Sequence, residues 1–349
     1  MIKIGVMDLT WFCKLLDYAL IRFQRGDMEA DRFISEFNRL YGNSEPFLFI
    51  VDFELSRFVL HPLSELGSSS DILYDFRGLT NYHGTNTRRS LPEITKRPIT
   101  FDSYRKSFDM VRKRQTDGDS YLLNLTFPTE IDVDLCFDEI FAGSRAEYKL
   151  KYGDEFVFFS PESFVRISGG YITTSPMKGT RLMTTADCER LLMDDEKELA
   201  EHITVVDLLR NDLNSVADDV SVTSFRYPSY IRHGEKTIVQ TSTDIRGRLR
   251  QDKDMASVIL GLLPAGSVSG APKRMTLDII RQAEGAPRGF YTGIAGVYDG
   301  ENIDTCVIIR YIEKKEGGTF FRSGGGITVY SRAQDEYAEL LEKVYVPII

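Results

Sequence analysis

"RGFYTGIAGVYDGENIDTCVIIRYIEK", residues 288–314, is the stretch that indicates the fold class most clearly. Two runs rich in β-branched and aromatic residues flank the polar turn "DGEN" at 299–302, a pattern typical of a β-hairpin. Further strand-like runs occur at 46–60, 120–131, 155–168, 237–249 and 320–331. The chain therefore contains many strands, several of which follow one another directly.

Helical patterns separate groups of strands rather than single strands. In "FDSYRKSFDMV", Phe101, Tyr104, Phe108 and Val111 fall on one helical face. We expect other helices over 187–213, 254–263 and 333–345, and one that begins at the glycine-rich segment 264–272. Strands that come in runs favour an α+β fold with mostly antiparallel sheets. The polar stretch 81–98 is the best candidate for a boundary or a flexible crossing.

Composition narrows the class of protein. The chain has 349 residues and a net charge of −9, which argues against nucleic acid as the main partner. No apolar run is long enough to span a bilayer, and the N-terminus does not read as a signal peptide. The four cysteines lie far apart and suit neither a zinc site nor a disulfide framework. We expect a soluble cytoplasmic protein with no membrane partner.

Two pairs of glutamates are candidates for a metal site. Glu198 and Glu201 are three residues apart in one predicted helix, and Glu336 and Glu339 repeat this spacing in another, so each pair lies on one face. Taken alone, such a pair is most often a solvated helix face. The residues after Glu201 are apolar all round, which predicts a buried helix and an inward-pointing Glu201. Buried carboxylates need a partner, and two pairs could bind Mg²⁺.

Three further stretches could bind an anion. "PAGSVSGAPK", residues 264–273, places small residues before a helix and ends on Lys273, although it lacks the spacing of a P-loop and could be an ordinary turn. The glycines of "RSGGGI", residues 322–327, allow close approach of a ligand or simply a bend. Arg310, in an apolar strand pattern, needs a carboxylate partner, either in the chain or in a ligand.

A lysine in "SPMKGTR", residues 175–181, completes the set of candidates. Lys178 directly follows a strand-like run and a turn-forming proline. A loop lysine usually extends its ammonium group into water, so this residue alone indicates nothing. From the residues alone, the constellation is that of an anion-binding α+β enzyme that could depend on Mg²⁺.

Taken together, these stretches resemble the chorismate-utilising enzymes, which include aminodeoxychorismate, anthranilate, isochorismate and salicylate synthases. The resemblance covers residues 100–346 and is carried by "GDSYLLNLTFP", "SPESFVRI", "SPMKGTR", "EKELAEHITVVDLLRNDL", "LPAGSVSGAPKRMTLDIIRQAEGAPRGFYTGIAGVYD", "DTCVIIR" and "SGGGITVYSRAQDEYAELLEK". It implies one large domain over 1–349 with two antiparallel sheets packed together and helices outside. Residues 1–98 would be a shorter, divergent part and 99–349 the motif-bearing catalytic part.

Within the family, the motif around Lys178 resembles the PIKGT signature of component I of aminodeoxychorismate synthase. That resemblance implies that chorismate and ammonia give 4-amino-4-deoxychorismate, for 4-aminobenzoate and folate synthesis. Glu162, in "SPESF", would protonate the departing C4 hydroxyl. Lys178 would add at C2 as the neutral amine, which desolvation or a neighbouring cation favours. Ammonia would then attack C4 and release the lysine.

The resemblance also assigns binding roles. Glu201 and Glu339 would bind Mg²⁺ directly, while Glu198 and Glu336 would hold its waters. The residues implied in substrate binding are Arg310 and Tyr291 on the enolpyruvyl carboxylate, Gly324 and Gly326 as backbone donors, and Ser269, Gly270 and Lys273 lining the anion pocket.

The chain departs from the family pattern at two places. Gln240 stands where anthranilate synthases have histidine, which argues against anthranilate formation and its elimination of pyruvate. The N-terminal part is shorter than in tryptophan-binding members, so we expect no tryptophan feedback site. No glutamine-hydrolysing motif is visible, so ammonia would be free or come from a separate glutamine amidotransferase subunit. The alternatives are an anthranilate or isochorismate synthase, or a non-catalytic subunit that binds chorismate or the amidotransferase.

Overall fold

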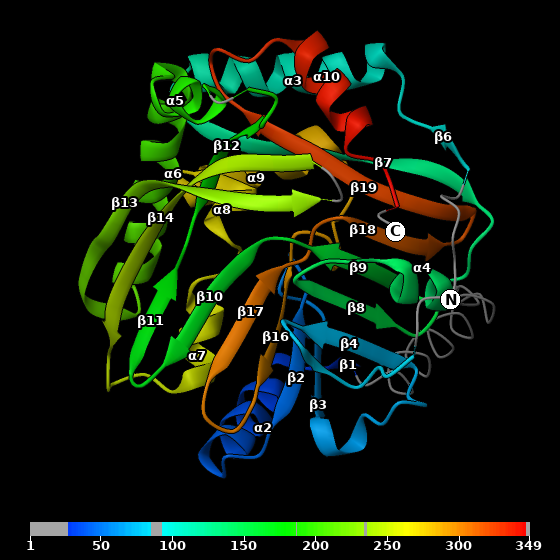
Figure 1. The fold of residues 1–349 in the computed structure, drawn as a ribbon, viewed down its shortest axis with the longest axis vertical. Coiled ribbons are helices and arrows are strands. Elements are labelled where there is room, and N and C mark those ends of the chain that lie inside the picture. Colours follow the sequence, from blue (N-terminus) through cyan, green and yellow to red (C-terminus); the bar gives the residue numbers. More distant parts are fainter. Residues whose placement is uncertain (1–26, 85–92, 186, 234–235, 347–349) are drawn as a thin grey trace, which may run out of the picture.

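The computed structural model describes residues 27–84, 93–185, 187–233 and 236–346. Strands form two sheets, and every strand pairing made by these residues is antiparallel. The fold is one α+β domain, as the sequence predicts (Figure 1).

The first sheet has the strand order β1-β3-β2-β16-β17-β10-β11-β14-β12, and β13 pairs with β14. Its strands are β1 (Asp27–Met28), β2 (Phe47–Val51), β3 (Phe58–Pro62), β10 (Ser163–Ser168), β11 (Tyr171–Thr174), β12 (Met177–Leu182), β13 (Ala217–His233), β14 (Lys236–Leu249), β16 (Ile294–Tyr298) and β17 (Ile303–Val307).

The second sheet has the order β15-β7-β19-β18-β9-β8-β4-β5, and β6 pairs with β7. Its strands are β4 (Ile72–Phe76), β5 (Leu79–Thr80), β6 (Ile94–Arg97), β7 (Leu122–Val133), β8 (Tyr148–Tyr152), β9 (Phe156–Ser160), β15 (Gly270–Ala271), β18 (Tyr311–Lys315) and β19 (Gly318–Ile327).

Helices cover the outer faces of both sheets (Figure 1). They are α2 (Ala30–Gly42), the short 3₁₀ helix η1 (Leu63–Glu65), α3 (Phe101–Thr116), α4 (Phe137–Gly143), α5 (Cys188–Met193), α6 (Glu196–Asn214), α7 (Met255–Gly261), α8 (Gly266–Ser269), α9 (Lys273–Glu284) and α10 (Ala333–Glu342).

Four groups of buried apolar side chains hold these layers together. One lies between the sheets and includes Leu48, Ile50, Leu150, Phe158 and Val297. A second packs α2, α6, α7 and α8 on the first sheet, and the other two pack α3, α9, α10 and α4 on the second sheet. The expectation of two packed sheets with helices outside is therefore confirmed.

The structure corrects three expected elements. The run 46–60 is not one strand but the hairpin β2–β3, because the Asp52 carboxylate accepts the backbone N–H groups of Ser56 and Arg57 and Leu55 adopts a φ of 56°. The segment 187–213 forms two helices, α5 and α6, rather than one. In addition, α6 is not buried all round, since Ile203 is 48% exposed.

The strand expected over 155–168 and the second run of the hairpin expected over 288–314 are both broken, because the chain leaves one sheet and enters the other at these points. β9 belongs to the second sheet and β10 to the first, with Glu162 between them. Likewise β17 belongs to the first sheet and β18 to the second, with Arg310 between them. The hairpin predicted around "DGEN" is confirmed as β16–β17.

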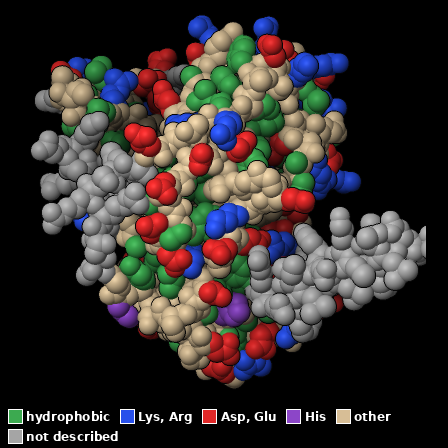
Figure 2. Space-filling model, turned by 90° about the vertical axis from the view of Figure 1, so that its right-hand side faces the viewer, with side chains coloured by type: hydrophobic (Ala, Val, Ile, Leu, Met, Phe, Trp, Pro, Cys, Tyr) green, Lys and Arg blue, Asp and Glu red, His purple; other side chains and the backbone are tan. Residues whose placement is uncertain are grey.

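The remaining broad expectations concern location and partners. On the face in Figure 2, basic side chains are scattered among acidic ones and form no basic stripe. None of the helices in the described part of the chain combines the length and apolar character needed to cross a bilayer. Part of the stretch 81–98 and all of 1–26 lie outside the described residues, so the boundary at 98 and the missing tryptophan site stay predictions.

Candidate active site

The site is built where the chain crosses between the sheets twice. Two backbone hydrogen bonds join the crossings: the Val307 N–H donates to the Glu162 carbonyl at 3.1 Å, and the Phe159 N–H donates to the Arg310 carbonyl at 3.2 Å. Arg310 itself takes a φ of 53°, the left-handed conformation of a sharp turn. Two residues that are 148 positions apart (162 and 310) therefore lie in adjacent crossings.

A cavity of about 170 Å³ opens beside these crossings. It brings together four of the predicted site residues, namely Glu162, Tyr291, Arg310 and Gly324. The rest of its lining consists of Asn124, Ser267, Val268, Thr292, Ile309, Phe321, Arg322, Ser323 and Lys343. The cavity thus holds a carboxyl group, a phenol and several cations.

Glu162 has the environment of a carboxyl group that keeps its proton. Part of the residue is exposed, but its carboxyl group is desolvated, and this burial raises the pKa of Glu162 above its ordinary value. The Ser267 hydroxyl donates to Oε1 at 2.7 Å and opposes the rise, as do the charges of Lys178 and Lys343. A carboxylic acid in this setting can donate a proton to a leaving group.

Lys178 lies on β12, at an irregularity in the pairing with β14. The register shifts between Lys178 and Thr180, and Gly179 between them has a φ of 75°, which favours glycine. A Cβ on Gly179 would also lie 2.8 Å from Glu198 Oε2 on α6. The bulge turns Lys178 toward α6, where its Nζ lies 3.2 Å from Glu201 Oε2. The side chain of Lys178 is 33% exposed and that of Glu201 is 27% exposed.

The four predicted metal ligands lie on α6 and α10. A Cβ at Gly325 of β19 would lie 3.2 Å from Glu336 Oε2 and 3.4 Å from Glu339 Oε1, so this glycine makes room for both carboxylates. Burial raises the pKa of Glu336, and the neighbouring charges of Glu339 and Glu201 raise it further. The carboxylates of the two helices therefore act on one another.

These glutamates do not form a closed set of ligands. Among the described residues, no group of three or more His, Cys, Asp or Glu side chains is gathered closely enough to hold a metal ion. Two lysines intervene, since Lys178 contacts Glu201 and Lys343 Nζ lies 2.6 Å from Glu339 Oε1. With all six groups ionised, the four carboxylates and the two ammonium groups would carry a net charge of −2. That charge and the hard oxygen donors fit one Mg²⁺ ion.

The glycine-rich strand presents backbone donors at an open edge. β18 pairs with β19 from Gly318 only to Arg322, so the later residues of β19 have no partner on that side. The Gly324 carbonyl accepts a 2.7 Å hydrogen bond from Lys343 Nζ and so points to the open edge. In a strand, the N–H of a residue points the same way as its C=O, and residue i+2 repeats the direction. The N–H groups of Gly324 and Gly326 therefore face this edge.

Arg310 and Tyr291 complete the polar surface of the cavity. Among the described residues, no carboxylate lies within ion-pair distance of Arg310; its guanidinium donates to the Lys343 carbonyl at 3.3 Å and lies 5.0 Å from the Tyr345 ring centre. Within the described part of the chain, the structural ion pair left open for Arg310 is therefore not formed. Burial raises the pKa of Tyr291 to about 12, so its phenol stays protonated and can donate a hydrogen bond.

Three predicted anion-binding residues lie outside the cavity lining. The Ser269 hydroxyl is buried and donates to the Ala265 carbonyl at 2.8 Å. Gly270 pairs with Leu123 of β7, and a Cβ there would lie 1.9 Å from the Leu122 carbonyl oxygen. Lys273 contacts Asp212 at 3.0 Å, so its charge is matched inside the fold. These three residues have structural contacts, and we carry none of them into a binding role.

The sequence reasoning missed three residues of the site. Lys343 follows Glu339 by four positions on the terminal helix, a spacing at which opposite charges pair, and this signal was present. Ser267, not Ser269, is the hydroxyl that reaches the cavity. His202 adjoins Glu201; its Nε2 lies 2.6 Å from Thr243 Oγ1, and burial lowers its pKa to about 4, so the ring is neutral.

The residue that replaces the family histidine has a local partner. The Gln240 amide nitrogen lies 2.7 Å from the Met177 sulfur, next to Lys178. An amide does not accept a proton as an imidazole does. This position therefore holds no base.

Comparisons with known proteins identify the family of the chain. The family of chorismate binding enzymes matches residues 32–348. An uncharacterized PabA-like protein of Pasteurella multocida is 44% identical over 92% of this chain and all of its own length. Aminodeoxychorismate synthase component 1 of Bacillus subtilis is 28% identical over 76% of this chain and 60% of its own.

A solved structure shares the fold. Component I of anthranilate synthase from Streptococcus pneumoniae superposes with a TM-score of 0.63 at 26% identity, covering 75% of this chain and 60% of its own. The family match extends over almost the whole chain, including both crossings and the helices that carry the four glutamates. The chain belongs to the chorismate binding enzymes.

Proposed function

We propose that this chorismate binding enzyme is an aminodeoxychorismate synthase component I, which converts chorismate and ammonia to 4-amino-4-deoxychorismate. The observation that carries the proposal is the position of Lys178. A bulge at Gly179 turns the lysine toward Glu201 of α6, and the Lys178 charge lowers the pKa of Glu162 against the effect of burial. A nucleophile and an acid of the required types are thus close enough to interact.

The proposed reaction assigns one task to each group. Lys178, as the free amine, forms a bond to C2 of chorismate while the C4–O bond breaks and Glu162 gives its proton to the departing hydroxyl, which leaves as water. Ammonia then forms a bond at C4, the C2–N bond to Lys178 breaks, and the lysine is released. Glu201 Oε2 lies 3.2 Å from Lys178 Nζ, and only the free amine of Lys178 can make the attack.

The substrate's carboxylates have complementary groups in the cavity. Arg310, Tyr291 and the N–H groups of Gly324 and Gly326 would bind the enolpyruvyl carboxylate, and Lys343 adds a further cation beside them. Glu201 and Glu339 would hold Mg²⁺ directly, with Glu198 and Glu336 holding its waters. When bound, Mg²⁺ would neutralise these carboxylates and fix the ring carboxylate of chorismate.

The residues at the site favour this reaction over its relatives. Anthranilate formation needs a further elimination of pyruvate, and Gln240, whose amide contacts Met177, supplies no base for it. Isochorismate formation uses water as the nucleophile and gives an amine at position 178 no covalent role. A non-catalytic subunit would not need an acid with a raised pKa beside a lysine. Ammonia would be free or come from a separate glutamine amidotransferase subunit.

The protonation of Glu162 can be tested through stability. Because its pKa is raised on folding, the folded chain binds more protons than the unfolded chain between the ordinary and the raised value. The contribution of Glu162 to stability is complete below its ordinary pKa and is lost as pH rises through the raised one. Glu162→Gln removes this loss, which is up to about 1.4 kcal/mol in the free energy of unfolding per pH unit. We expect the variant to gain stability relative to wild type as pH rises in urea unfolding; a constant difference would contradict the assignment.

The covalent role of Lys178 can be tested by withholding ammonia. Chorismate with Mg²⁺ should then leave an adduct on the intact protein, which mass spectrometry should locate in the peptide containing "SPMKGTR". Lys178→Ala should lose the adduct and most of the ammonium-dependent rate. Lys178→Arg should fail as well, because a guanidinium stays protonated and cannot attack. If Lys178→Arg kept the ammonium-dependent rate and no adduct formed, Lys178 would only anchor the substrate through its charge.

The metal role of the glutamates can be tested with paired substitutions on the same helices. Glu201→Gln and Glu339→Gln should abolish turnover and weaken Mg²⁺ binding measured by calorimetry, because each removes a hard anionic ligand. Glu196→Gln on α6 and Glu342→Gln on α10 are exposed matched controls and should behave as wild type. Turnover that persists in excess chelator would remove Mg²⁺ from the proposal.

A further inference from the structure

Arg288, which follows α9, is a fully buried charge whose hydrogen bonds are all made. Its side chain is 1% exposed and forms a forked ion pair with Glu284, through Nε at 2.9 Å and Nη2 at 2.6 Å. Nη1 also donates to the Val268 carbonyl at 2.8 Å and to the Thr292 hydroxyl at 3.2 Å, and Nη2 donates to the Asn124 carbonyl at 2.6 Å. A guanidinium has five N–H donors, so none is left over.

The three acceptors other than Glu284 belong to three different walls of the active-site cavity. Asn124, on β7, pairs with Gly326. Val268 follows Ser267, whose hydroxyl donates to Glu162. Thr292 follows Tyr291 in the chain. One planar group thus fixes the segments that carry the glycine edge, the partner of the acid and the phenol.

Glu284 adds a second attachment to the same strand. Its Oε1 accepts the Thr126 N–H at 2.9 Å and the Thr126 hydroxyl at 3.0 Å. Thr126 pairs with Gly324, as Asn124 pairs with Gly326. The ion pair therefore fixes β7 at Asn124 and Thr126. These residues lie opposite Gly326 and Gly324, whose N–H groups face the open edge.

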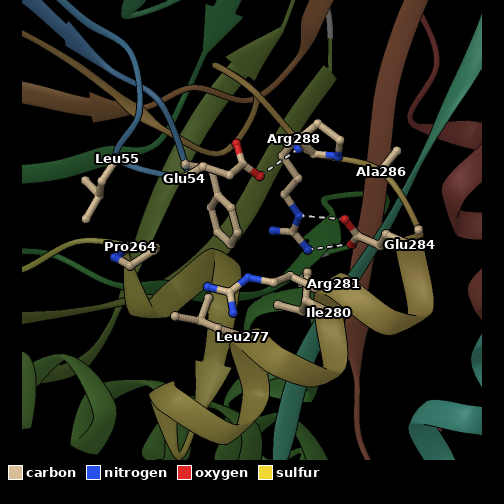
Figure 3. A pocket seen from close by; sticks show the side chains of 12 residues that line it. Glu54, Leu55, Pro264, Leu277, Ile280, Arg281, Glu284, Ala286 and Arg288 are labelled. Carbon is tan, nitrogen blue, oxygen red and sulfur yellow. Dashed lines mark hydrogen bonds and ion pairs between the residues drawn. The ribbon is translucent and has the colours of Figure 1, made fainter. Parts of the chain in front are cut away.

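A second cavity, of about 450 Å³, lies on the other side of Arg288 (Figure 3). In this view the Arg288–Glu284 pair lies above Arg281 and Ile280 of α9. The Arg288 guanidinium lies 4.5 Å from the Phe53 ring centre, and Arg281, 71% exposed, lies toward solvent. A small cation could reach the position of Arg288 from this side.

We propose that Arg288 is a positioning residue for chorismate: it acts through Asn124, Val268 and Thr292 to place the groups that bind the substrate. A buried ion pair adds little stability compared with apolar residues of the same volume, so stability alone does not explain five hydrogen bonds to so many segments. The rate measurements below rest on the proposed function, whereas the binding measurements rest only on membership of the chorismate binding enzymes.

The first experiment compares two Arg→Lys changes beside one cavity. A lysine keeps the positive charge of Arg288, but its ammonium group lacks the planar fork of donors and cannot hydrogen-bond to Asn124, Val268 and Thr292 together with Glu284. Arg288→Lys should weaken chorismate binding in calorimetry by at least about tenfold, and kcat/KM should fall at least as far, because small misplacements of binding groups are costly. Arg281→Lys, the matched control, should stay within about twofold of wild type. A folded Arg288→Lys protein that binds chorismate as wild type does would overturn the proposal.

The second experiment restores the missing group. In Arg288→Ala, ethylguanidinium can enter through the outer cavity and should recover chorismate binding in a saturable way. Ethylammonium, which lacks the planar fork, should recover little. If Arg288 served folding alone, either cation would restore the melting temperature and the chorismate affinity of Arg288→Ala to the same extent. That result would contradict a positioning role.

A milder variant decides the matter if both changes at position 288 prevent folding. Thr126→Val removes the 3.0 Å hydrogen bond to Glu284 and keeps the shape of the side chain. We expect a severalfold loss of chorismate affinity in this variant, and unchanged affinity would overturn the proposal. If wild type binds chorismate but forms no amino product, the proposed function fails, while the binding comparisons still decide the role of Arg288.

Discussion

The pair of backbone hydrogen bonds between the two chain crossings is the constraint on which the site depends. Each crossing carries one functional side chain, Glu162 or Arg310, at the point where a strand of one sheet ends and a strand of the other begins. The apolar layer between the sheets fixes the relative position of the crossings, so the packing of the core sets the geometry of the site.

Charge balance then determines what the cavity can do. Lysines contact one glutamate on each of the two helices that carry the glutamate pairs, Lys178 with Glu201 on α6 and Lys343 with Glu339 on α10. Burial raises the pKa of Glu162 and of Glu336. At Glu162 the neighbouring groups only oppose the rise, whereas at Glu336 the carboxylates of Glu339 and Glu201 add to it while Ser331 and Lys343 oppose it. The environment of Glu162 suits a proton donor. At Glu336, a further positive charge nearby would be stabilising.

Much of this arrangement could be predicted from sequence because it depends on local pattern. The α+β class, the "DGEN" hairpin and the helix with Phe101, Tyr104, Phe108 and Val111 on one face follow from periodicity and turn chemistry, and the structure confirms them. The site residues Glu162, Tyr291, Arg310 and Gly324 were named from the family resemblance, and the structure brings them to one cavity.

What could not be predicted depends on contacts between distant segments. The sequence patterns at 155–168 and 288–314 give no sign that the chain changes sheets at Glu162 and Arg310, because strand-forming residues lie on both sides of each point. The resemblance implies Ser269, whereas Ser267 is the hydroxyl that donates to Glu162. The short helix α8 sets which hydroxyl faces the cavity, and a glycine-rich pattern does not predict that helix. Lys273 looked like an anion ligand because its partner Asp212 lies 61 positions away in the sequence (212 and 273).

In the proposed reaction, Lys178 and Glu162 together direct ammonia to C4 of chorismate. The most direct test supplies the purified chain with chorismate, Mg²⁺ and isotopically labelled ammonium and identifies the product by mass spectrometry and NMR. The account predicts 4-amino-4-deoxychorismate, with the label at C4 and the enolpyruvyl group retained. Labelled anthranilate with release of pyruvate, or isochorismate without nitrogen, would contradict it.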